Sequence, residues 1–446
     1  MNDENILGTM SIKKLFFRLA IPAVLGQLVN VLYNLVDRMF IGHIADTGAE
    51  ALAGVGVTAP VILAISALAA LVSMGGAPKA SIMMGKGKKE EAEKILGSCT
   101  FMILILSALV TAVMLLFGRN ILWCFGASSA TIDYAVSYMN CYCVGTVFIQ
   151  LTLGLNAFIS AQGFTLISMI NVAVGAVINV ALDPVFIYVM KMGVRGAALA
   201  TVISQAVTSG LVVYFLCGDQ TLVRLRIKTI RFCPSVLGPC ILLGLSPALM
   251  QLTENLVAIS FNTSLQKYGG DIVVASMSIL NSIMQFVMLL LPGMVQGAQP
   301  ILSFNLGLGN IERVKQTFRY LLTVCLTGSF LIWLVCMLCP QKVASIFTNN
   351  QELIAYSGWS IRVYLMMLLI YGIQVACQYS FVALDQAPSA IFLTIWRKII
   401  LLIPLIFILP HIVSNPTFGI FLAEPIADTI AICTTAPMFY RFYRSL

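Results

Sequence analysis

Two aspartates stand inside long apolar runs of the sequence, where a charged side chain needs a reason. Asp37 lies near the end of the run that contains NVLYNLVDRMFIG, and Asp183 precedes Pro184 in INVALDPVFIY. An aspartate at the centre of a lipid-spanning run costs about 2.5 to 3.5 kcal/mol, so a functional role is the first hypothesis. Two carboxylates held close together repel each other, and such a pair can take up and release a proton.

Polar side chains recur at helical spacing in three of these runs. Residues three or four apart share one face of a helix, so each set forms a stripe. The stripes are Gln27, Asn30, Asn34 and Asp37 in the first run, Tyr138, Tyr142, Thr146 and Gln150 in the fourth, and Asn171, Gly175, Asn179 and Asp183 in the fifth. Amides in lipid can equally join helices to one another, so the carboxylates carry the functional argument.

The two aspartates are predicted to lie at one depth. Asp37 and Asp183 come shortly before the outer ends of outward-running helices, and Tyr138 and Thr201 come about two turns into helices that enter from outside. At about 1.5 Å per residue, all four lie roughly one to two turns below the outer surface. Together with Asn179, they predict a proton-coupling site.

A purely structural interpretation of the aspartates stays open. Asp37 could pair with its neighbour Arg38 near the membrane surface, and Asp183 could stabilise a bend before Pro184. Consecutive residues of a helix point about 100° apart, so Arg38 need not follow Asp37 into the interior.

The second half of the chain also has intramembrane charges. They are Glu254, beside Asn255, in LMQLTENLVAIS, Glu424 and Asp428 in AEPIAD, and Arg397 with Lys398. Two interpretations remain open: an internal salt bridge between these groups, or a second ion-coupling site.

The elements that position these residues follow from composition. Of 446 residues, 59% are hydrophobic and 10% are charged, and apolar runs of about twenty residues or more recur along the whole chain. We expect twelve membrane spans, at 15–41, 52–77, 95–117, 131–159, 164–189, 194–217, 236–262, 271–300, 316–339, 353–383, 388–411 and 415–440. The runs do not alternate polar with apolar residues, so they are predicted to be helices and not barrel strands.

The distribution of basic residues predicts the orientation. All but seven of the 26 Lys and Arg residues fall in the N-terminus, the inner connections and the C-terminus if both termini are cytoplasmic. The seven are Arg38, Arg119, Lys191, Arg195, Lys267, Lys342 and Arg362. The segment MNDENILGTMSIKKLFFRLA has no cleavable signal, so the first run is expected to remain a span.

Several classes of protein are not expected. The twelve cysteines lie mostly in apolar runs, there are two histidines, and no phosphate-binding G-x-x-x-x-G-K-[ST] loop occurs. We therefore expect no cofactor, no metal centre, no catalytic residue and no nucleic-acid partner. The net charge of +8 is explained by topology.

The chain consists of two similar halves. The polar connection CGDQTLVRLRIKTIRFCP separates six runs from six, which predicts an N-terminal half (1–217), a cytoplasmic linker (218–233) and a C-terminal half (234–446). The segment GGAPKASIMMGKGKKEEAEK corresponds to QGAQPILSFNLGLGNIERVK at an offset of 221 to 222 residues. Each half has an even number of spans, so the predicted fold is an all-α polytopic membrane protein of two parallel six-helix repeats around a central cleft.

These segments resemble the multidrug and toxic compound extrusion (MATE) transporters. The matching segments are IPAVLGQLVNVLYNLVDRMFIG, INVALDPVFIY, RGAALAT and PGMVQGAQPILSFNLGLGN, and they look most like the bacterial branch that includes the staphylococcal multidrug exporter. The resemblance implies a cation site of Asp37, Asn179 and Asp183, with Tyr138 and Thr201 beside it. Other members of the family use a sodium site in the second half, built from a glutamate of the seventh span and an aspartate of the tenth. Glu254 matches the glutamate, but the tenth span departs from the pattern, with only Gln374 and Gln378.

The expected function is a secondary antiporter that exports amphipathic, cationic organic compounds in exchange for H⁺ or Na⁺. Candidates for the substrate cleft are Gln27, Asn30, Asn34, Tyr142 and Gln150. The alternative is a lipid-linked saccharide flippase of the same superfamily, which should carry more cationic residues in its cleft. The partners expected are small organic cations and membrane lipids, for a monomer in the bacterial inner membrane.

Overall fold

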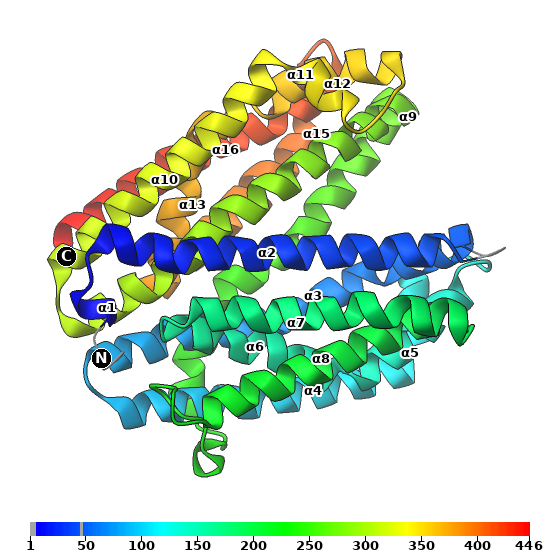
Figure 1. Ribbon diagram of the computed structural model, residues 1–446. Helices are drawn as coiled ribbons and strands as arrows, with labels where there is room; N and C mark the ends of the chain where they lie inside the picture. The colour runs from blue at the N-terminus through cyan, green and yellow to red at the C-terminus, as the bar shows by residue number, and fades with distance from the viewer. Residues whose placement is uncertain (1–5, 45–47) are drawn as a thin grey trace.

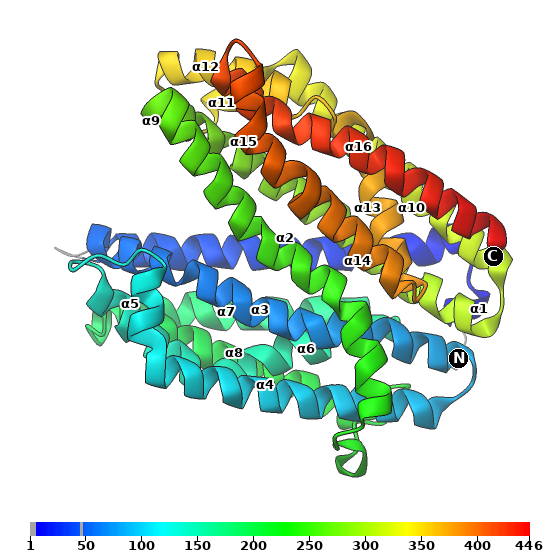
Figure 2. The same cartoon turned by 180° about the vertical axis from the view of Figure 1, so that it is seen from behind.

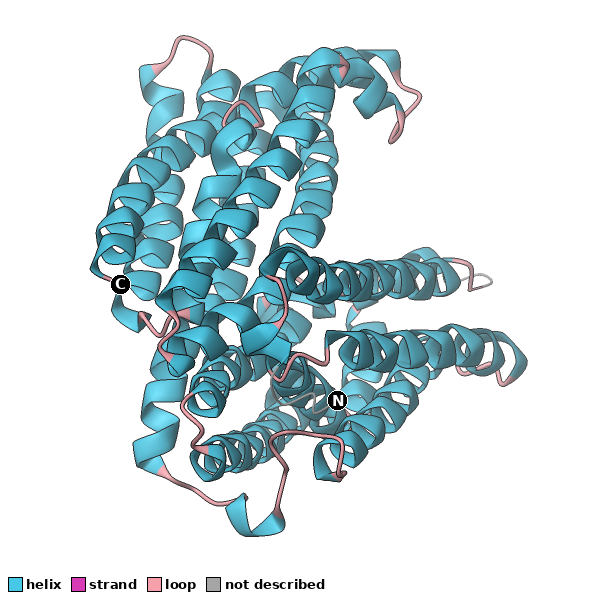
Figure 3. Ribbon diagram, turned by 60° about the vertical axis from the view of Figure 1, so that its left-hand side comes forward, coloured by secondary structure: helices cyan, strands magenta, loops and turns pink. Residues whose placement is uncertain are grey.

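All regular structure in the described residues, 6–44 and 48–446 of a computed structural model, is helical (Figure 3). The first half contains α1 (Ile6–Thr9), α2 (Ile12–Gly42), α3 (Gly48–Gly85), α4 (Lys89–Cys124), α5 (Ile132–Val144), α6 (Thr146–Ala161), α7 (Thr165–Pro184), the π-helix η2 (Val185–Val189) and α8 (Val194–Cys217). The 3₁₀-helix η3 (Ile227–Thr229) lies in the linker. The second half contains α9 (Pro234–Leu308), α10 (Ile311–Leu338), α11 (Pro340–Ser345), α12 (Gln351–Tyr364), α13 (Leu368–Ala383), α14 (Ala387–Ile395), the π-helix η4 (Trp396–Leu402), α15 (Ile403–Ile412) and α16 (Pro416–Ser445).

The twelve predicted spans are present, although three of the regions differ from simple helices. Within the described residues, nine helices are long and apolar enough to cross a membrane, and the bent pairs α5 with α6 (59°) and α12 with α13 (50°) bring the total to eleven. The 75-residue helix α9 contains two predicted spans, which meet at Gly270 (φ 68°, ψ −160°). Only glycine adopts this conformation readily, so the chain turns there. The predicted twelve-helix architecture is confirmed.

The helices form two groups that meet at one end of the molecule. In Figures 1 and 2, α3 to α8 form one bundle and α9 to α16 the other, while α2 runs along the boundary. The groups approach each other where α1 and the C-terminal end of α16 lie, and they diverge toward the opposite end. We call these the closed end and the open end.

At the closed end, α3 and α9 pack backbone against backbone. A Cβ atom on Gly85 would overlap the carbonyl oxygen of Phe304, and a Cβ atom on Gly307 would overlap the carbonyl oxygen of Ile82. Residues 82 and 304 are separated by the same 222 positions as residues 85 and 307. The two contacts are therefore equivalent under the internal repeat, which places an approximate twofold axis between them.

Local signals in the second half fix where helices begin and end. Gly309 has a left-handed conformation (φ 76°) after α9, and the Asn310 side chain accepts a hydrogen bond from the Arg313 N–H at the start of α10. Asn350 and Asn415 cap α12 and α16 in the same way. These caps provide partners for N–H groups of the first turn that have none within their own helix.

Candidate functional site

The structure brings together the five residues of the predicted N-half site. Asp37 comes from α2, Tyr138 from α5, Asn179 and Asp183 from one face of α7, and Thr201 from α8, and all five are buried. The Asn179 Nδ2 donates to the Thr201 Oγ1 at 3.4 Å. The Asp37 and Asp183 carboxylates lie within electrostatic range of each other, and Tyr138 is in range of both.

Four oxygen atoms of this site are buried without a partner. Among the described residues, no hydrogen-bond donor reaches Asp37 Oδ1, either carboxylate oxygen of Asp183, or Asn179 Oδ1. Arg38 and Asp37 are both described by the structure, and they form no ion pair with each other. Buried polar atoms are nearly always satisfied in proteins, so an orphaned cluster of this kind points to something that binds there. A set of oxygen ligands suits a proton or a hard cation such as Na⁺.

The backbone next to Asp183 is also unusual. The α-helix α7 ends at Pro184, and the chain continues as the π-helix η2. Short π-helical turns are frequent at functional sites. The Tyr188 hydroxyl of η2 donates to the Phe40 carbonyl of α2 at 2.7 Å. This bond joins the two helices that carry Asp37 and Asp183.

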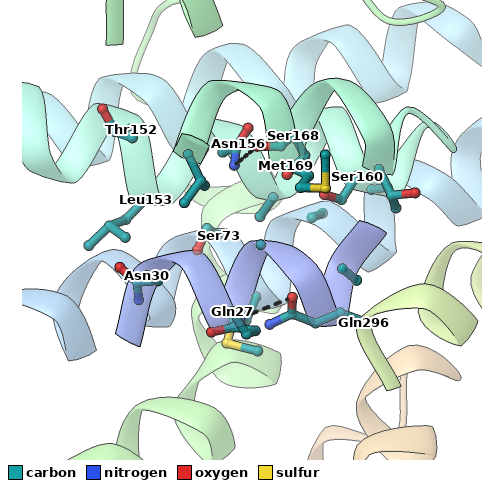
Figure 4. Close-up of a pocket in the computed structure, with 18 of the residues that line it drawn as sticks. Gln27, Asn30, Ser73, Thr152, Leu153, Asn156, Ser160, Ser168, Met169 and Gln296 are labelled. Carbon is teal, nitrogen blue, oxygen red and sulfur yellow. Dashed lines mark hydrogen bonds between the residues drawn. The ribbon is translucent and has the colours of Figure 1, made fainter. Parts of the chain in front are cut away.

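A cavity of about 370 Å³ lies between the two groups of helices (Figure 4). Its wall comes from α2, α3, α6, α7 and α8 of the first half and from α9 of the second. The Gln27 Nε2 donates to the Gln296 Oε1 at 3.2 Å across the boundary. The volume is in the usual range for sites that bind small organic molecules.

Amides and hydroxyls provide the polarity of this cavity. Among the described residues, its lining has no charged side chain. The amides are Gln27, Asn30, Asn156, Gln205, Gln251, Gln296 and Gln299, and serines and threonines line much of the rest. Such a surface offers hydrogen-bond acceptors to a cation without repelling it.

Two of the five predicted cleft residues, Gln27 and Asn30, line this cavity. The others are placed elsewhere. The Asn34 side chain donates to the Asn30 carbonyl at 2.7 Å, and the Tyr142 ring stacks on Tyr138 with 5.9 Å between centroids. Gln150 is fully buried, and its amide has no hydrogen-bond partner among the described residues.

The sequence prediction missed the contribution of α9 to the cavity. Gln296 and Gln299 are three residues apart, so they share one helix face, and both line the cavity. That spacing inside an apolar run is the same signal that identified Gln27 and Asn30, so the sequence contains the information that predicts this part of the cavity wall.

The charges of the second half form a paired network. The Arg397 Nη2 donates to the Glu424 Oε1 at 3.0 Å, and the Arg397 Nε donates to the Asp428 Oδ1 at 2.7 Å. The Lys398 Nζ donates to the Glu254 Oε1 at 2.7 Å. Both cations belong to the π-helix η4. The salt-bridge alternative therefore describes the geometry of these groups. Asn255 follows Glu254 in α9.

These features define the class of protein. Two six-helix repeats that cross a membrane, with a cavity between them and unpaired acids nearby, are the architecture of a transporter. The chain belongs to the MatE family, whose model matches residues 22–185 and 247–408. MATE transporters are multi-pass membrane proteins and are not enzymes.

Curated relatives cover nearly the whole chain. The multidrug export protein MepA of Staphylococcus haemolyticus is 25% identical over 442 residues, which are 97% of this chain and 95% of the relative. The protein of the same name from Staphylococcus saprophyticus is 24% identical over 444 residues, 98% of this chain and 96% of the relative. The chain is thus similar to multidrug export proteins along its full length.

Solved structures share the fold. A MATE protein in a bent conformation superposes with a TM-score of 0.93 at 23% identity, covering 100% of this chain and 98% of that one. An outward-facing multidrug resistance MATE family transporter of the MOP superfamily gives 0.91 at 23% identity, with the same coverage. A MOP superfamily transporter from Pyrococcus furiosus, for which reverse polarity of the binding pocket suggests a different function, gives 0.91 at 24% identity, also covering 100% and 98%.

Proposed function

We propose that this protein is a secondary antiporter that exports amphipathic organic cations in exchange for protons. The observation that carries the proposal is the cluster of unpartnered oxygens at Asp37, Asn179 and Asp183. These groups are buried and lie on the half that supplies most of the cavity wall. A proton bound there removes a buried charge, which changes the energy of the local packing.

Helix α2 provides the connection between ion and substrate. Tyr33, one turn before Asp37 on the same helix, lines the cavity, and Gln27 on α2 bonds to the second half. A change of charge at Asp37 therefore acts on the helix that forms both the cavity wall and the boundary between the halves. Through this helix, proton binding biases the equilibrium between a state open at one end and a state open at the other.

The driving force is adequate for export. Exchange of one inward proton for one outward monovalent cation moves no net charge, so the membrane potential drives this antiport only when a second proton enters in each cycle. With two protons per cycle, the one net charge that crosses about 100 mV releases about 2.3 kcal/mol, which at about 1.4 kcal/mol per tenfold change supports a substrate gradient of roughly fiftyfold.

The uncharged cavity supports organic cations as substrates and argues against the flippase alternative. A carrier of lipid-linked phosphates should present cations to them, yet no Lys or Arg lines the described cavity wall. The cations of η4 are already paired with carboxylates. The names of the curated relatives, multidrug export proteins, support the export of drugs as the transport activity.

The proposal includes an orientation. The closed end carries the turn between α3 and α4, with Lys86, Lys88 and Lys89, and basic connections favour the cytoplasm. We therefore propose a monomer in the bacterial inner membrane with both termini cytoplasmic. The open end then faces outward.

The test is transport by purified protein in liposomes. Efflux of a fluorescent organic cation is followed under an imposed proton gradient or an imposed sodium gradient, for the wild type, Asp37→Asn and Asp183→Asn. We expect the proton gradient alone to drive efflux and both variants to lose it. Asp133→Asn is the matched control, because Asp133 is exposed and pairs with Arg119 away from the site.

Each other outcome has a defined meaning. Efflux driven only by a sodium gradient would mean that Na⁺, and not a proton, is the coupling ion bound by the same oxygen cluster. Undiminished efflux by folded Asp37→Asn and Asp183→Asn would show that the N-half site does not couple transport.

A further inference from the structure

A second cavity, of about 560 Å³, lies at the closed end, away from the cavity between the halves. Its wall is formed by the end of α3, the start of α4, the linker and the first turns of α9, with Asp385 from the second half. The charged residues that line it are Lys79, Lys86, Glu91, Lys94, Arg231 and Asp385. The coupling residues Asp37, Asn179 and Asp183 do not line this cavity.

The cavity has more positive than negative side chains, and its negative side chains are already paired. Lys79 is paired with Asp385 at 2.6 Å, and Glu91 is paired with Lys88 at 3.0 Å, so both acids are already neutralised. Three cations remain that form no ion pair among the described residues: Lys86, Lys94 and Arg231. The cavity is therefore a concave surface with an uncompensated positive charge, which favours an anion.

The start of α9 strengthens this preference. The helix begins at Pro234, and Ser235 and Val236 of its first turn line the cavity. Unpaired N–H groups and the helix dipole make a helix N-terminus favourable for phosphate groups. This feature adds to the three cations, which come from three different segments.

The linker beside the cavity indicates which class of anion the cavity binds. Ile227 and Phe232 are 89% and 58% exposed, although they lie on a connection outside the helices that cross the membrane. They are interspersed with Arg226, Lys228 and Arg231. Exposed apolar side chains among cations are typical of a segment that lies in the headgroup region of a membrane.

We propose that this cavity binds the phosphate group of an anionic phospholipid, with Lys86, Lys94 and Arg231 as its ligands. Met83 and Val236, which also line it and are half-buried, face the upper part of the acyl chains. The bound lipid contacts α3, α4 and the start of α9 together at the closed end. This site does not depend on the proposed antiport reaction.

Native mass spectrometry of the purified, detergent-solubilised full chain tests the proposal. The probes are phosphatidylglycerol, phosphatidylcholine and inorganic phosphate, each titrated separately. We expect one phosphatidylglycerol to remain bound to the wild type. Each interfacial Lys or Arg contributes on the order of 1 kcal/mol, so K86Q/K94Q/R231Q should bind it about a hundredfold more weakly.

The matched control removes three exposed cations from the open end. K191Q/K342Q/R362Q has the same net charge as the first triple variant, and none of these residues lines the cavity. It should retain wild-type affinity. K86R/K94R keeps the charge and should also bind, which separates loss of charge from loss of folding.

The outcomes are distinct. Equal loss in the two triple variants would mean a general effect of net charge and would overturn the site. Equal binding of phosphatidylcholine and phosphatidylglycerol would overturn the requirement for an anionic lipid. Saturable binding of inorganic phosphate, lost only in K86Q/K94Q/R231Q and not matched by phosphatidylglycerol, would keep the anion site and overturn the lipid as its source.

Discussion

Lys79 of α3 and Asp385, between α13 and α14, form an ion pair of 2.6 Å that joins the two halves at the closed end. The residues are 306 positions apart in sequence. Asp385 has a left-handed backbone conformation (φ 61°), which is uncommon for a residue other than glycine. It lies in the short turn between α13 and α14. If the protein alternates between two openings, this pair must break when the closed end opens.

Removal of this ion pair should favour opening of the closed end. The side chains are 16% and 39% exposed, so the ion pair is expected to stabilise the closed state of this end by about 0.2 to 1 kcal/mol. Lys79→Gln should therefore shift the ratio of the open to the closed state by up to about fivefold. The distance between spin labels on α3 and α13, measured by pulsed electron resonance, reports this ratio. The charge swap Lys79→Asp with Asp385→Lys should restore it, whereas an unchanged distance distribution in Lys79→Gln would contradict a latch.

Alanine at Gly85 or Gly307 should destabilise the closed end. The added Cβ would overlap a carbonyl oxygen of the opposite half, and overpacking of this kind costs typically 1 to 3 kcal/mol. The thermal unfolding of detergent-solubilised protein measures the loss. Gly210→Ala is the control, since nothing lies within 4 Å of the Cβ it would add. Equal stability of Gly85→Ala and Gly210→Ala would show that the helices separate easily here.

Removal of Arg397 should destabilise the second half strongly. Its guanidinium pairs with Glu424 and Asp428 and lies 5.0 Å from the centre of the Tyr371 ring, so Arg397→Met leaves two buried carboxylates without their cation. Breaking a buried ion pair in this way costs about 3 to 5 kcal/mol. The variant R397M/E424Q/D428N should recover most of the stability, as measured by thermal unfolding. A single variant as stable as the triple would contradict the paired network.

The thiol of Cys233 should react at a lower pH than an ordinary cysteine. The Ser235 hydroxyl, 3.4 Å from the sulfur, and then the Val236 backbone and the cations Arg231 and Lys94, lower the pKa of Cys233 by stabilising the thiolate. A lower pKa means more thiolate at a given pH, so alkylation should reach its half-maximal rate at a lower pH than in the denatured chain. Ser235→Ala should move the midpoint upward, as followed by mass spectrometry of the modified peptide; an unmoved midpoint would exclude the hydroxyl as the cause.

A positive charge placed in the cavity should exclude organic cations. Asn30 lines the cavity. A like charge about 8 Å from a bound cation costs about 2 kcal/mol of binding free energy at an effective dielectric constant near 20. Asn30→Lys should therefore weaken the binding of an organic cation roughly thirtyfold. Fluorescence titration with an organic cation measures this affinity. Asn34→Lys, one turn away and outside the cavity lining, is the control. A similar loss for a neutral ligand would indicate a blocked cavity and not charge repulsion.

Residue spacing predicted which groups of the first half come together, since Asp37, Asn179 and Asp183 lie on helices whose direction and depth follow from hydropathy. The same spacing could not show which cleft candidates reach the cavity. Asn34 shares a face with Asn30, yet its amide turns back to the Asn30 carbonyl. A rotamer choice of this kind depends on neighbours that sequence order does not reveal.

The C-half network could be named from sequence but not assembled. Arg397 and Lys398 are adjacent, yet they pair with acids on different helices, α16 and α9. The π-helical winding of η4 changes the directions of successive side chains, and hydropathy carries no signal for it. The bends between α5 and α6 and between α12 and α13 were likewise invisible within continuous apolar runs.

The reciprocal contact of Gly85 with Phe304 and of Gly307 with Ile82 has the form of an isologous interface, in which the same patch of each partner meets the other. A chain of half this length could form the same contact with a second copy of itself. The protein therefore preserves the geometry of a homodimer of six-helix units inside one polypeptide. Within that symmetry the units have diverged. Among the described residues, Asp37 and Asp183 of the first unit form no ion pair, whereas Glu254, Glu424 and Asp428 of the second are paired with Lys398 and Arg397.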